Sequence, residues 1–173
     1  MSYRQWEIAV DELSPVQRTG LEYWQSLPAH ADTAIPLTSS FELLRIPAPI
    51  LPTTHVVDVL DGGRAYRYRF WGSGFRAYLG YDGTGMSTDD LMPEEIRDPV
   101  RKAYLDVVNA RRPLAMLSEF ARGDTPRQGF QRFIRFPLVA ENGSVAQVVS
   151  LVEFLMDDHE AQELIGTVNR ENE

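Results

Sequence analysis

Apolar and polar side chains alternate with a period of two in several short stretches, which is the pattern of a half-buried β-strand. It is clearest in Ala65–Trp71, where aromatic residues alternate with Arg67 and Arg69. Such runs, together with apolar runs rich in Val, predict five strands, at residues 55–60, 65–71, 114–121, 129–139 and 145–155. The turn signals Asp61-Gly62-Gly63 and Asn142-Gly143 predict a hairpin and, later in the chain, a three-strand meander.

Two other segments repeat their apolar residues with helical spacing. In the first, 14–27, Ser14 is placed to cap the helix and Pro15 occupies its first position. In the second, 98–112, Asp98 is the expected cap. Each helix has one apolar face, so each needs a packing partner.

Together the elements predict an α+β fold, with one antiparallel sheet and its helices gathered on one face. The last strand complicates this picture because it is apolar on both sides: Val149 and Leu151 point one way, and Val148 and Val152 the other. Such a strand needs a cover on each face. The amphipathic helix 14–27 can supply the second cover, either within one chain or across a dimer.

Glycines follow the second strand closely and predict short helical turns that form the wall of a pocket. Gly80, Gly83 and Gly85 have the spacing G-x-x-G-x-G, without the Lys-Ser/Thr of a phosphate-binding P-loop. Backbone turns with positive φ explain these glycines more simply. Ser87, with Asp90 three residues later, predicts a capping box.

Composition excludes several classes of function. The 173 residues suit one domain with appendages, and the absence of Cys excludes disulfides, thiolate metal sites and cysteinyl-flavin chemistry. The net charge of −8 argues against nucleic acid as a partner. The chain has neither an apolar run of about 18 residues for a membrane span nor a secretory signal. We therefore expect a cytoplasmic protein with no membrane partner.

Charge is unevenly distributed along the chain. Residues 64–136 carry 13 basic and 9 acidic groups, whereas 1–63 carry 3 basic and 8 acidic groups, and 137–173 carry 1 basic and 8 acidic groups. One interpretation is a solvated central domain with acidic flanks. The other is that the central Arg residues attract an anionic ligand or the acidic flanks themselves.

The order of elements and the glycine-rich segment resemble a PAS domain, and more narrowly a bacterial stand-alone PAS family with an N-terminal helix and a motif of the type RYR-x-x-G…G-x-D-x-T-G. The resemblance covers about residues 20–155, and its matching residues are Trp24, 41–52, 66–73, 79–85, 136–138 and 142–143. It implies a PAS-like five-stranded antiparallel sheet curled over short helices and one long helix. It also implies a small-molecule or protein-contact site between sheet and helices, and dimerisation through the N-terminal helix.

This resemblance divides the chain into three parts. Residues 1–53 form an N-terminal helix and a proline-rich lead-in that packs on the domain, 54–156 form the PAS core, and 157–173 form an acidic tail. The tail is weakly amphipathic, which is typical either of a helix that leaves the domain or of a frayed end.

Residues suited to catalysis or metal binding are few, and we predict none of either kind. His30, His55 and His159 are the only histidines, and none has the Ser and Asp neighbours of a nucleophilic triad. No spacing of His and carboxylates predicts a metal site. Haem-binding PAS domains usually take their axial ligand from the long helix, which here offers only Tyr104. Haem and cysteinyl flavin are therefore disfavoured, and the identity of any cofactor stays open.

A pocket between sheet and helices remains the candidate site, although the same aromatic set would also suit a plain core. Arg132 alternates onto the same strand face as Ile134, and an Arg on an apolar face needs a carboxylate or an anionic ligand. Glu119, on the neighbouring strand, is the alternative partner. The candidate pocket residues are Tyr68, Phe70, Phe75, Leu79, Met86, Leu91, Tyr104, Val108, Met116, Phe120, Arg132 and Ile134.

These observations predict a non-enzymatic PAS-type sensory or regulatory module in bacterial signalling, which binds a small molecule or a partner protein. We expect a homodimer formed through helix 14–27, and an unidentified signalling partner that receives the output. The candidate dimer-interface residues are Leu21, Trp24, Leu27, Val148 and Val152.

Two alternatives from other classes stay open. One is a small α+β cone-fold enzyme, whose cavity would hold an acid/base pair such as His55 with Asp58 or Asp89. The other is a pure dimerisation adaptor without a ligand.

Overall fold

A computed structural model describes residues 4–121, 128–155 and 158–171 of the chain. Its strands and longer helices follow one another as β1 (Gln5–Glu7), α1 (Pro15–Ser26), β2 (Thr54–Leu60), β3 (Ala65–Trp71), α2 (Phe75–Leu79), α3 (Arg97–Ala110), β4 (Leu114–Ala121), β5 (Gln128–Val139), β6 (Val145–Leu155) and α4 (Asp158–Glu171). Short 3-10 turns connect several of them, among them η5 (Thr88–Asp90) and η6 (Glu94–Ile96).

All the strands form one antiparallel sheet in the order β1-β4-β5-β6-β2-β3. The predicted hairpin is β2 and β3, and the predicted meander is β4, β5 and β6, so both predictions are confirmed. The sheet has six strands where five were predicted, because Gln5–Glu7 pairs with the edge strand β4. Three residues are too few to show a periodic pattern.

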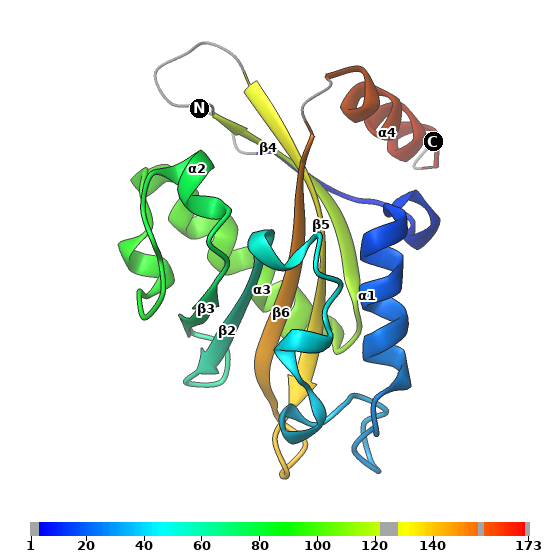
Figure 1. Cartoon of the computed structure of the whole chain (residues 1–173), viewed down its shortest axis with the longest axis vertical. Helices are drawn as coiled ribbons and strands as arrows, with labels where there is room; N and C mark the ends of the chain where they lie inside the picture. The colour runs from blue at the N-terminus through cyan, green and yellow to red at the C-terminus, as the bar shows by residue number, and fades with distance from the viewer. Residues whose placement is uncertain (1–3, 122–127, 156–157, 172–173) are drawn as a thin grey trace.

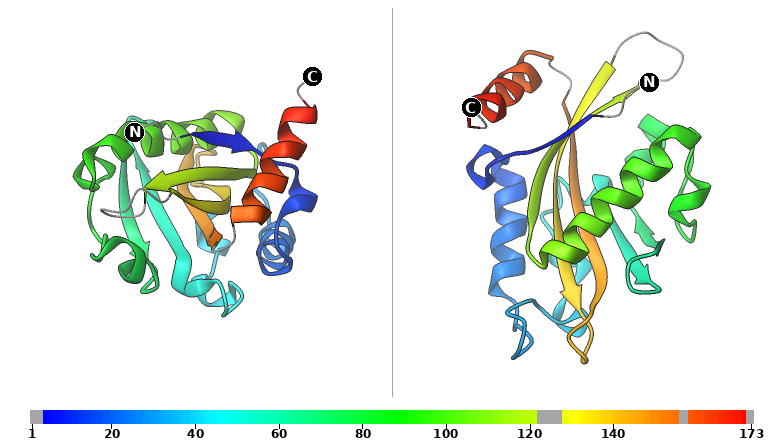
Figure 2. Two further views of the ribbon diagram at one scale, coloured as in Figure 1. Left: turned by 90° about the horizontal axis from the view of Figure 1, so that it is seen from above. Right: turned by 180° about the vertical axis from the view of Figure 1, so that it is seen from behind.

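Helices cover both faces of the sheet (Figures 1 and 2). α2, α3 and the turns η5 and η6 lie on one face, and α1 lies on the other. Helix α1 therefore supplies the second cover that β6 requires, and it does so within one chain.

Local interactions explain why α1 forms and where it docks. Ser14 caps the helix in a capping box with Gln17, and Pro15 lies in its first turn, as the sequence predicts. The Gln17 side chain also donates from Nε2 to the carbonyl oxygens of Arg132 and Leu151, at 3.0 and 3.2 Å. Near the other end of the helix, Trp24 donates from Nε1 to the carbonyl oxygen of Pro137 at 2.9 Å.

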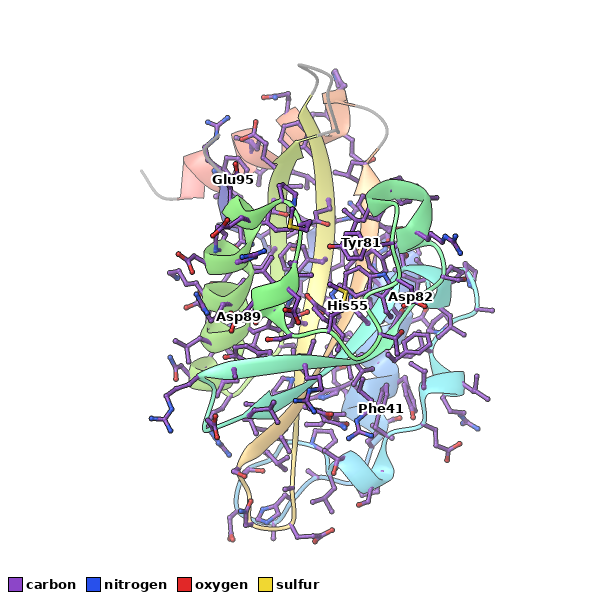
Figure 3. The ribbon with its side chains drawn as sticks, turned by 90° about the vertical axis from the view of Figure 1, so that its left-hand side faces the viewer. Phe41, His55, Tyr81, Asp82, Asp89 and Glu95 are labelled. Atoms are coloured by element: carbon purple, nitrogen blue, oxygen red, sulfur yellow. The ribbon has the colours of Figure 1, made fainter. Side chains whose placement is uncertain are left out.

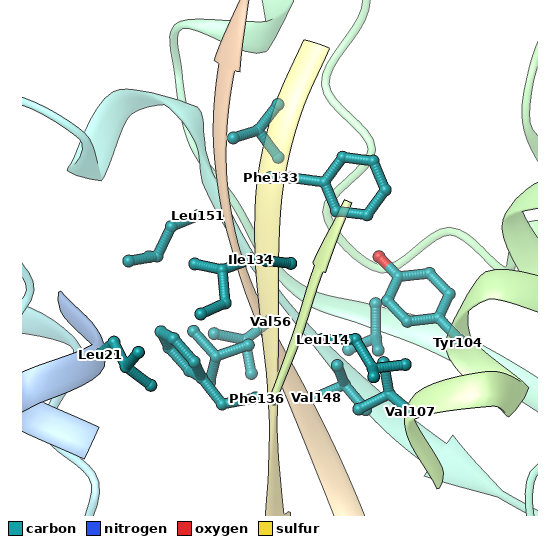
Figure 4. Packing of buried hydrophobic residues seen from close by; sticks show 14 of the residues in the cluster. Leu21, Val56, Tyr104, Val107, Leu114, Phe133, Ile134, Phe136, Val148 and Leu151 are labelled. Atoms are coloured by element: carbon teal, nitrogen blue, oxygen red, sulfur yellow. The ribbon is translucent and has the colours of Figure 1, made fainter. Parts of the chain in front are cut away.

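Side chains on both faces of the sheet belong to one hydrophobic core, because alternate residues of the central strands point to opposite faces (Figure 4). Ile134 and Phe136 point toward Leu21 of α1, whereas Phe133 points toward Tyr104 of α3. Both sets are fully buried. The apolar character of β5 and β6 on both sides thus reflects a three-layer arrangement.

Helix α4 packs on the domain and does not leave it. Its apolar residues Ala161, Leu164 and Val168 are buried in the common core, and Glu160 pairs with Arg132 at 3.0 Å. Within residues 4–121, 128–155 and 158–171, no helix has the length and apolar character that a membrane span requires.

Candidate functional site

A cavity lies between the sheet and the segment that runs from α2 through η6 into α3. Its volume is about 110 Å³. The residues that line it come from seven elements and the loops between them: His55, Tyr68, Trp71, Phe75, Leu79, Tyr81, Leu91, Pro93, Ile96, Val100, Gln131, Phe133, Arg135, Val152 and Phe154. Figure 3 shows His55 in the interior, between the sheet and the segment that carries Tyr81 and Asp89.

Polar residues cross the floor of this cavity in a row. Trp71 pairs with His55 across β3 and β2, His55 with Ser150 across β2 and β6, and Ser150 with Arg135 across β6 and β5. Directly opposite residues of antiparallel strands project to the same side, so all four side chains lie on the face of the sheet that α2 and α3 cover. The row is tightly packed: His55 stacks on Trp71 with ring centroids 5.6 Å apart, and Arg135 donates from Nε to Ser150 Oγ at 3.2 Å.

Several polar atoms of this row are buried without a hydrogen-bond partner. They are both ring nitrogens of His55, Nε1 of Trp71 and Nη1 of Arg135. A buried polar group left in this state costs about 1–3 kcal/mol, so such groups are rare in folded proteins. All four atoms are closed to a water-sized probe, so they lie in the packed wall beside the cavity and not on its open surface.

Arg135 is held among aromatic rings. Its guanidinium carbon lies 4.1 Å from the ring centroid of Tyr104 and 4.5 Å from that of Phe133, which are favourable cation–π contacts. The side chain is only 5% exposed, yet it forms no ion pair with any residue that the structure describes.

The other titratable residues of the cavity are neutral at physiological pH. Burial, and then the nearby Arg135 charge, lower the pKa of His55 well below 6.5. Burial, followed by the influence of Tyr104, raises the pKa of Tyr68 well above 10, and burial raises the pKa of Tyr81. Among the described residues that line the cavity, Arg135 therefore carries the only charge.

A β-bulge brings Trp71 into the cavity. On β2, the consecutive residues Val56 and Val57 pair with Phe70 and Tyr68 of β3. Arg69, which lies between those two β3 residues, has no partner on β2 and is the extra residue of the bulge. After the bulge the alternation is reversed, and Tyr68 and Trp71 share the cavity face while Phe70 lies on the other face.

The glycines of this segment have more than one role. Gly80 and Gly85 have φ of 81° and 84°, which confirms the predicted left-handed turns. Gly83 has a different reason to be glycine: a Cβ there would lie 2.6 Å from the ring of Trp71. The capping box of Ser87 and Asp90 is also confirmed.

The structure places four of the twelve predicted pocket residues on the cavity wall: Tyr68, Phe75, Leu79 and Leu91. Three others lie close to it without lining it. Tyr104 packs behind Arg135, Met116 lies beside Phe133 on the cavity face of the sheet, and Met86 accepts a backbone hydrogen bond from Tyr68. Val108 lies at the β2–β3 turn, at the other end of these strands. The side chain of Phe120 is outside the described residues.

Phe70, Arg132 and Ile134 lie on the opposite face, and their assignment to the pocket was wrong. Arg132 pairs instead with Glu153 and Glu160, at 2.9 and 3.0 Å. The proposed partner Glu119 binds Arg4 at 2.8 Å. Both faces of β5 are apolar and each carries an Arg, so strand periodicity alone does not show which face borders the cavity.

The sequence-based prediction of the pocket did not include Arg135 and Trp71, which line the cavity. A signal for Arg135 exists in the sequence, because Ser150 interrupts the apolar run of β6 at the position that pairs with it. No local signal marks the bulge that brings Trp71 inward.

Four of the five predicted dimer-interface residues are buried inside this chain. Leu21 and Trp24 are buried against this chain's own sheet, and Trp24 stacks on Phe136 with ring centroids 6.2 Å apart. Val148 and Val152 are buried in the same core. Only Leu27, at the end of α1, is partly exposed.

The His–acid pair of the cone-fold enzyme hypothesis is not formed. The carboxylate of Asp58 binds Arg69 at 2.7 Å and Gln147 at 3.0 Å on the opposite face of the sheet. Asp89 binds Arg101 at 2.6 Å. None of the described cavity-lining residues is acidic.

A flavin does not fit this cavity. An apolar cavity of about 150 Å³ admits benzene, whereas a flavin has three fused rings and the space available here is about 110 Å³. The rings of Tyr68, Trp71 and Phe75 occupy the floor, and the chain has no Cys for an adduct.

Comparisons with known proteins identify the fold. Neither a protein-family model nor a curated protein sequence matches the chain. Among solved structures, the dark structure of the blue-light photoreceptor Aureochrome1 LOV is similar with a TM-score of 0.53 and 17% identity, covering 76% of this chain and 94% of that chain. An RNA-binding Light-Oxygen-Voltage receptor is similar with a TM-score of 0.52 and 13% identity, covering 99% of this chain and 43% of that chain.

A PAS domain from Colwellia psychrerythraea also matches, with a TM-score of 0.43 and 14% identity, covering 59% of this chain and 86% of that chain. The two LOV structures with TM-scores above 0.5 share the α+β fold of this chain, which confirms the predicted fold class. The narrower bacterial PAS family stays a prediction.

Proposed function

We propose that the protein is a non-enzymatic PAS-type sensory or regulatory module of a signalling system, which responds to a small molecule bound in the cavity. The observation that carries this proposal is Arg135, a buried charged residue on the cavity wall that forms no ion pair with any residue that the structure describes. A core built only for stability would pair this charge or replace the side chain with an apolar one. PAS and LOV domains are signalling modules that bind small molecules, which supports the same conclusion.

Signal output in this proposal comes from a population shift, because a ligand that binds one conformation more tightly favours it. Arg132 links β5, one wall of the cavity, to Glu160 of α4, so α4 is the element best placed to pass a change on to a partner protein. RNA binding, which is a property of one similar structure, is not part of the proposal, because the net charge of −8 disfavours contact with phosphates.

A thermal-shift screen of small metabolites, combined with native mass spectrometry of the purified protein, tests this function. The matched variant is Val152→Phe, which fills the cavity from a buried lining position. A ligand at about 100 times its Kd stabilises the folded state by about 2.7 kcal/mol. We expect at least one compound to raise the Tm of the wild type by several degrees and to leave that of Val152→Phe unchanged. Compounds that shift both proteins equally, or no shift at all, would contradict the proposal.

A further inference from the structure

The chemistry of the cavity narrows the class of ligand that it can hold. We propose that the cavity binds a small monocarboxylate, with the carboxylate on Arg135 and with a short apolar chain between the aromatic side chains. This inference rests on the function proposed above, namely that the cavity is a ligand site.

The first argument is the comparison of two arginines on the same strand. Arg132 and Arg135 are 9% and 5% exposed. Arg132 is satisfied by two carboxylates, those of Glu153 and Glu160. Arg135 has no carboxylate partner among the described residues, and its Nη1 has no hydrogen-bond partner. Because buried charges are normally paired, the missing counter-charge is most simply an anion that enters the cavity.

The second argument is the chemistry of the one charged lining residue. The guanidinium of Arg135 can only donate hydrogen bonds. An ionised carboxylate accepts hydrogen bonds and donates none, so it matches this side chain. A phosphate dianion would bring a second negative charge, for which the described lining residues provide no cation.

The third argument is size and polarity. The cavity measures about 110 Å³, somewhat less than the roughly 150 Å³ that admits benzene in an apolar cavity. The polar row lies at its buried floor, whereas Leu79, Pro93 and Ile96 are partly or fully exposed at its edge. A ligand with its charge on the floor and its apolar part toward this edge satisfies both regions.

Isothermal titration calorimetry with propionate tests the proposal, with propionamide as the neutral analogue of similar shape and sodium chloride as the inorganic anion. We expect the full chain to bind propionate with a Kd below about 1 mM and to bind propionamide at least tenfold more weakly. Chloride at the same ionic strength should not reproduce the binding heat.

Two matched variants separate a ligand-binding Arg from a structural one. Arg135→Met should lose at least tenfold in propionate affinity without a fall in Tm, because removing an unpaired buried charge relieves a cost. Arg132→Met, on the opposite face, should lower the Tm because it breaks two ion pairs, and should keep the propionate affinity within about twofold.

The outcomes distinguish this inference from the function on which it rests. Equal binding of propionate and propionamide, both abolished by Val152→Phe, would overturn the carboxylate assignment and leave the cavity as a ligand site. Binding of propionate that survives Val152→Phe would overturn both. Absence of propionate binding, chloride heats equal to those of propionate, or a lower Tm of Arg135→Met with unchanged affinity would each overturn the carboxylate assignment.

Discussion

His55 shows how strongly the fold can alter a single residue. It is 7% exposed, stacked on Trp71 and close to Phe75, with ring centroids 5.6 and 4.8 Å apart. An imidazolium in this place would lose its hydration and would face the Arg135 charge, so the pKa of His55 lies well below 6.5. The same residue in an unfolded chain titrates near 6.5.

Stability should therefore depend on pH through His55. Between its folded and unfolded pKa values the unfolded state binds more protons, so the free energy of unfolding falls as pH decreases below 6.5. Between about pH 7.5 and about pH 5.5 we expect His55 to contribute a loss of about 1.4 kcal/mol. Urea unfolding at both pH values measures it. His55→Phe should remove this part of the pH dependence, whereas His159→Gln, on the exposed face of α4, should keep it. An unchanged dependence in His55→Phe would contradict the assignment.

Elements in this protein are attached to one another by a few buried polar contacts in addition to apolar packing. Gln17 is the main example: it is fully buried, and its side chain joins the start of α1 to the backbones of β5 and β6. Its Oε1 also accepts from the backbone N–H of Ser14. A single amide thus caps the helix and fixes its position on the sheet.

Replacing Gln17 by Leu should lower the free energy of unfolding by about 1–3 kcal/mol, because the polar groups that it satisfies are left without their partner. Glu22→Gln, on the exposed side of the same helix, is the control and should change stability by less than about 0.5 kcal/mol. Chemical denaturation of the two variants provides the comparison. Equal stability of Gln17→Leu and wild type would show that apolar packing alone positions α1.

The molecule as a whole is a sheet between two helical layers, and this arrangement changes the interpretation of its N-terminal helix. The apolar face of α1 is used inside the chain, so a homodimer would need another surface. Leu44 is the most exposed of the large hydrophobic residues that the structure describes, at 84%.

Trp24→Ala should therefore destabilise the fold by about 3–5 kcal/mol and leave the molar mass in solution unchanged. Light scattering after size-exclusion chromatography gives the mass, and urea unfolding gives the stability. Leu44→Ala is the control and should leave stability within about 0.5 kcal/mol of the wild type. A folded Trp24→Ala protein with half the mass of the wild type would restore α1 as a dimer interface.

Local patterns in the sequence were sufficient to define most of the elements, although β1 was missed. The bounds of β3, β4 and β6 are those predicted, and β2, β5, α1 and α3 differ by one or two residues. Alternation, capping residues and Asn-Gly turns act over a few neighbouring residues, so they can be recognised without the fold; the cap predicted at Asp98 was wrong, because Asp98 lies inside α3. The two-sided apolar character of β6 predicted a second cover, which α1 could supply within one chain or across a dimer.

The composition of the cavity depended on contacts between distant segments. The arginine that lines the cavity is Arg135 and not the predicted Arg132. β5 is apolar on both sides, and only its pairing with β4 and β6 determines which face meets α2 and α3. Trp71 joined the cavity because of a bulge against β2. The unpaired state of Arg135 follows from where every carboxylate of the described chain lies, which no local pattern contains. Elements arise from short-range interactions, whereas the site arises from the long-range packing that sets neighbours, burial and charge.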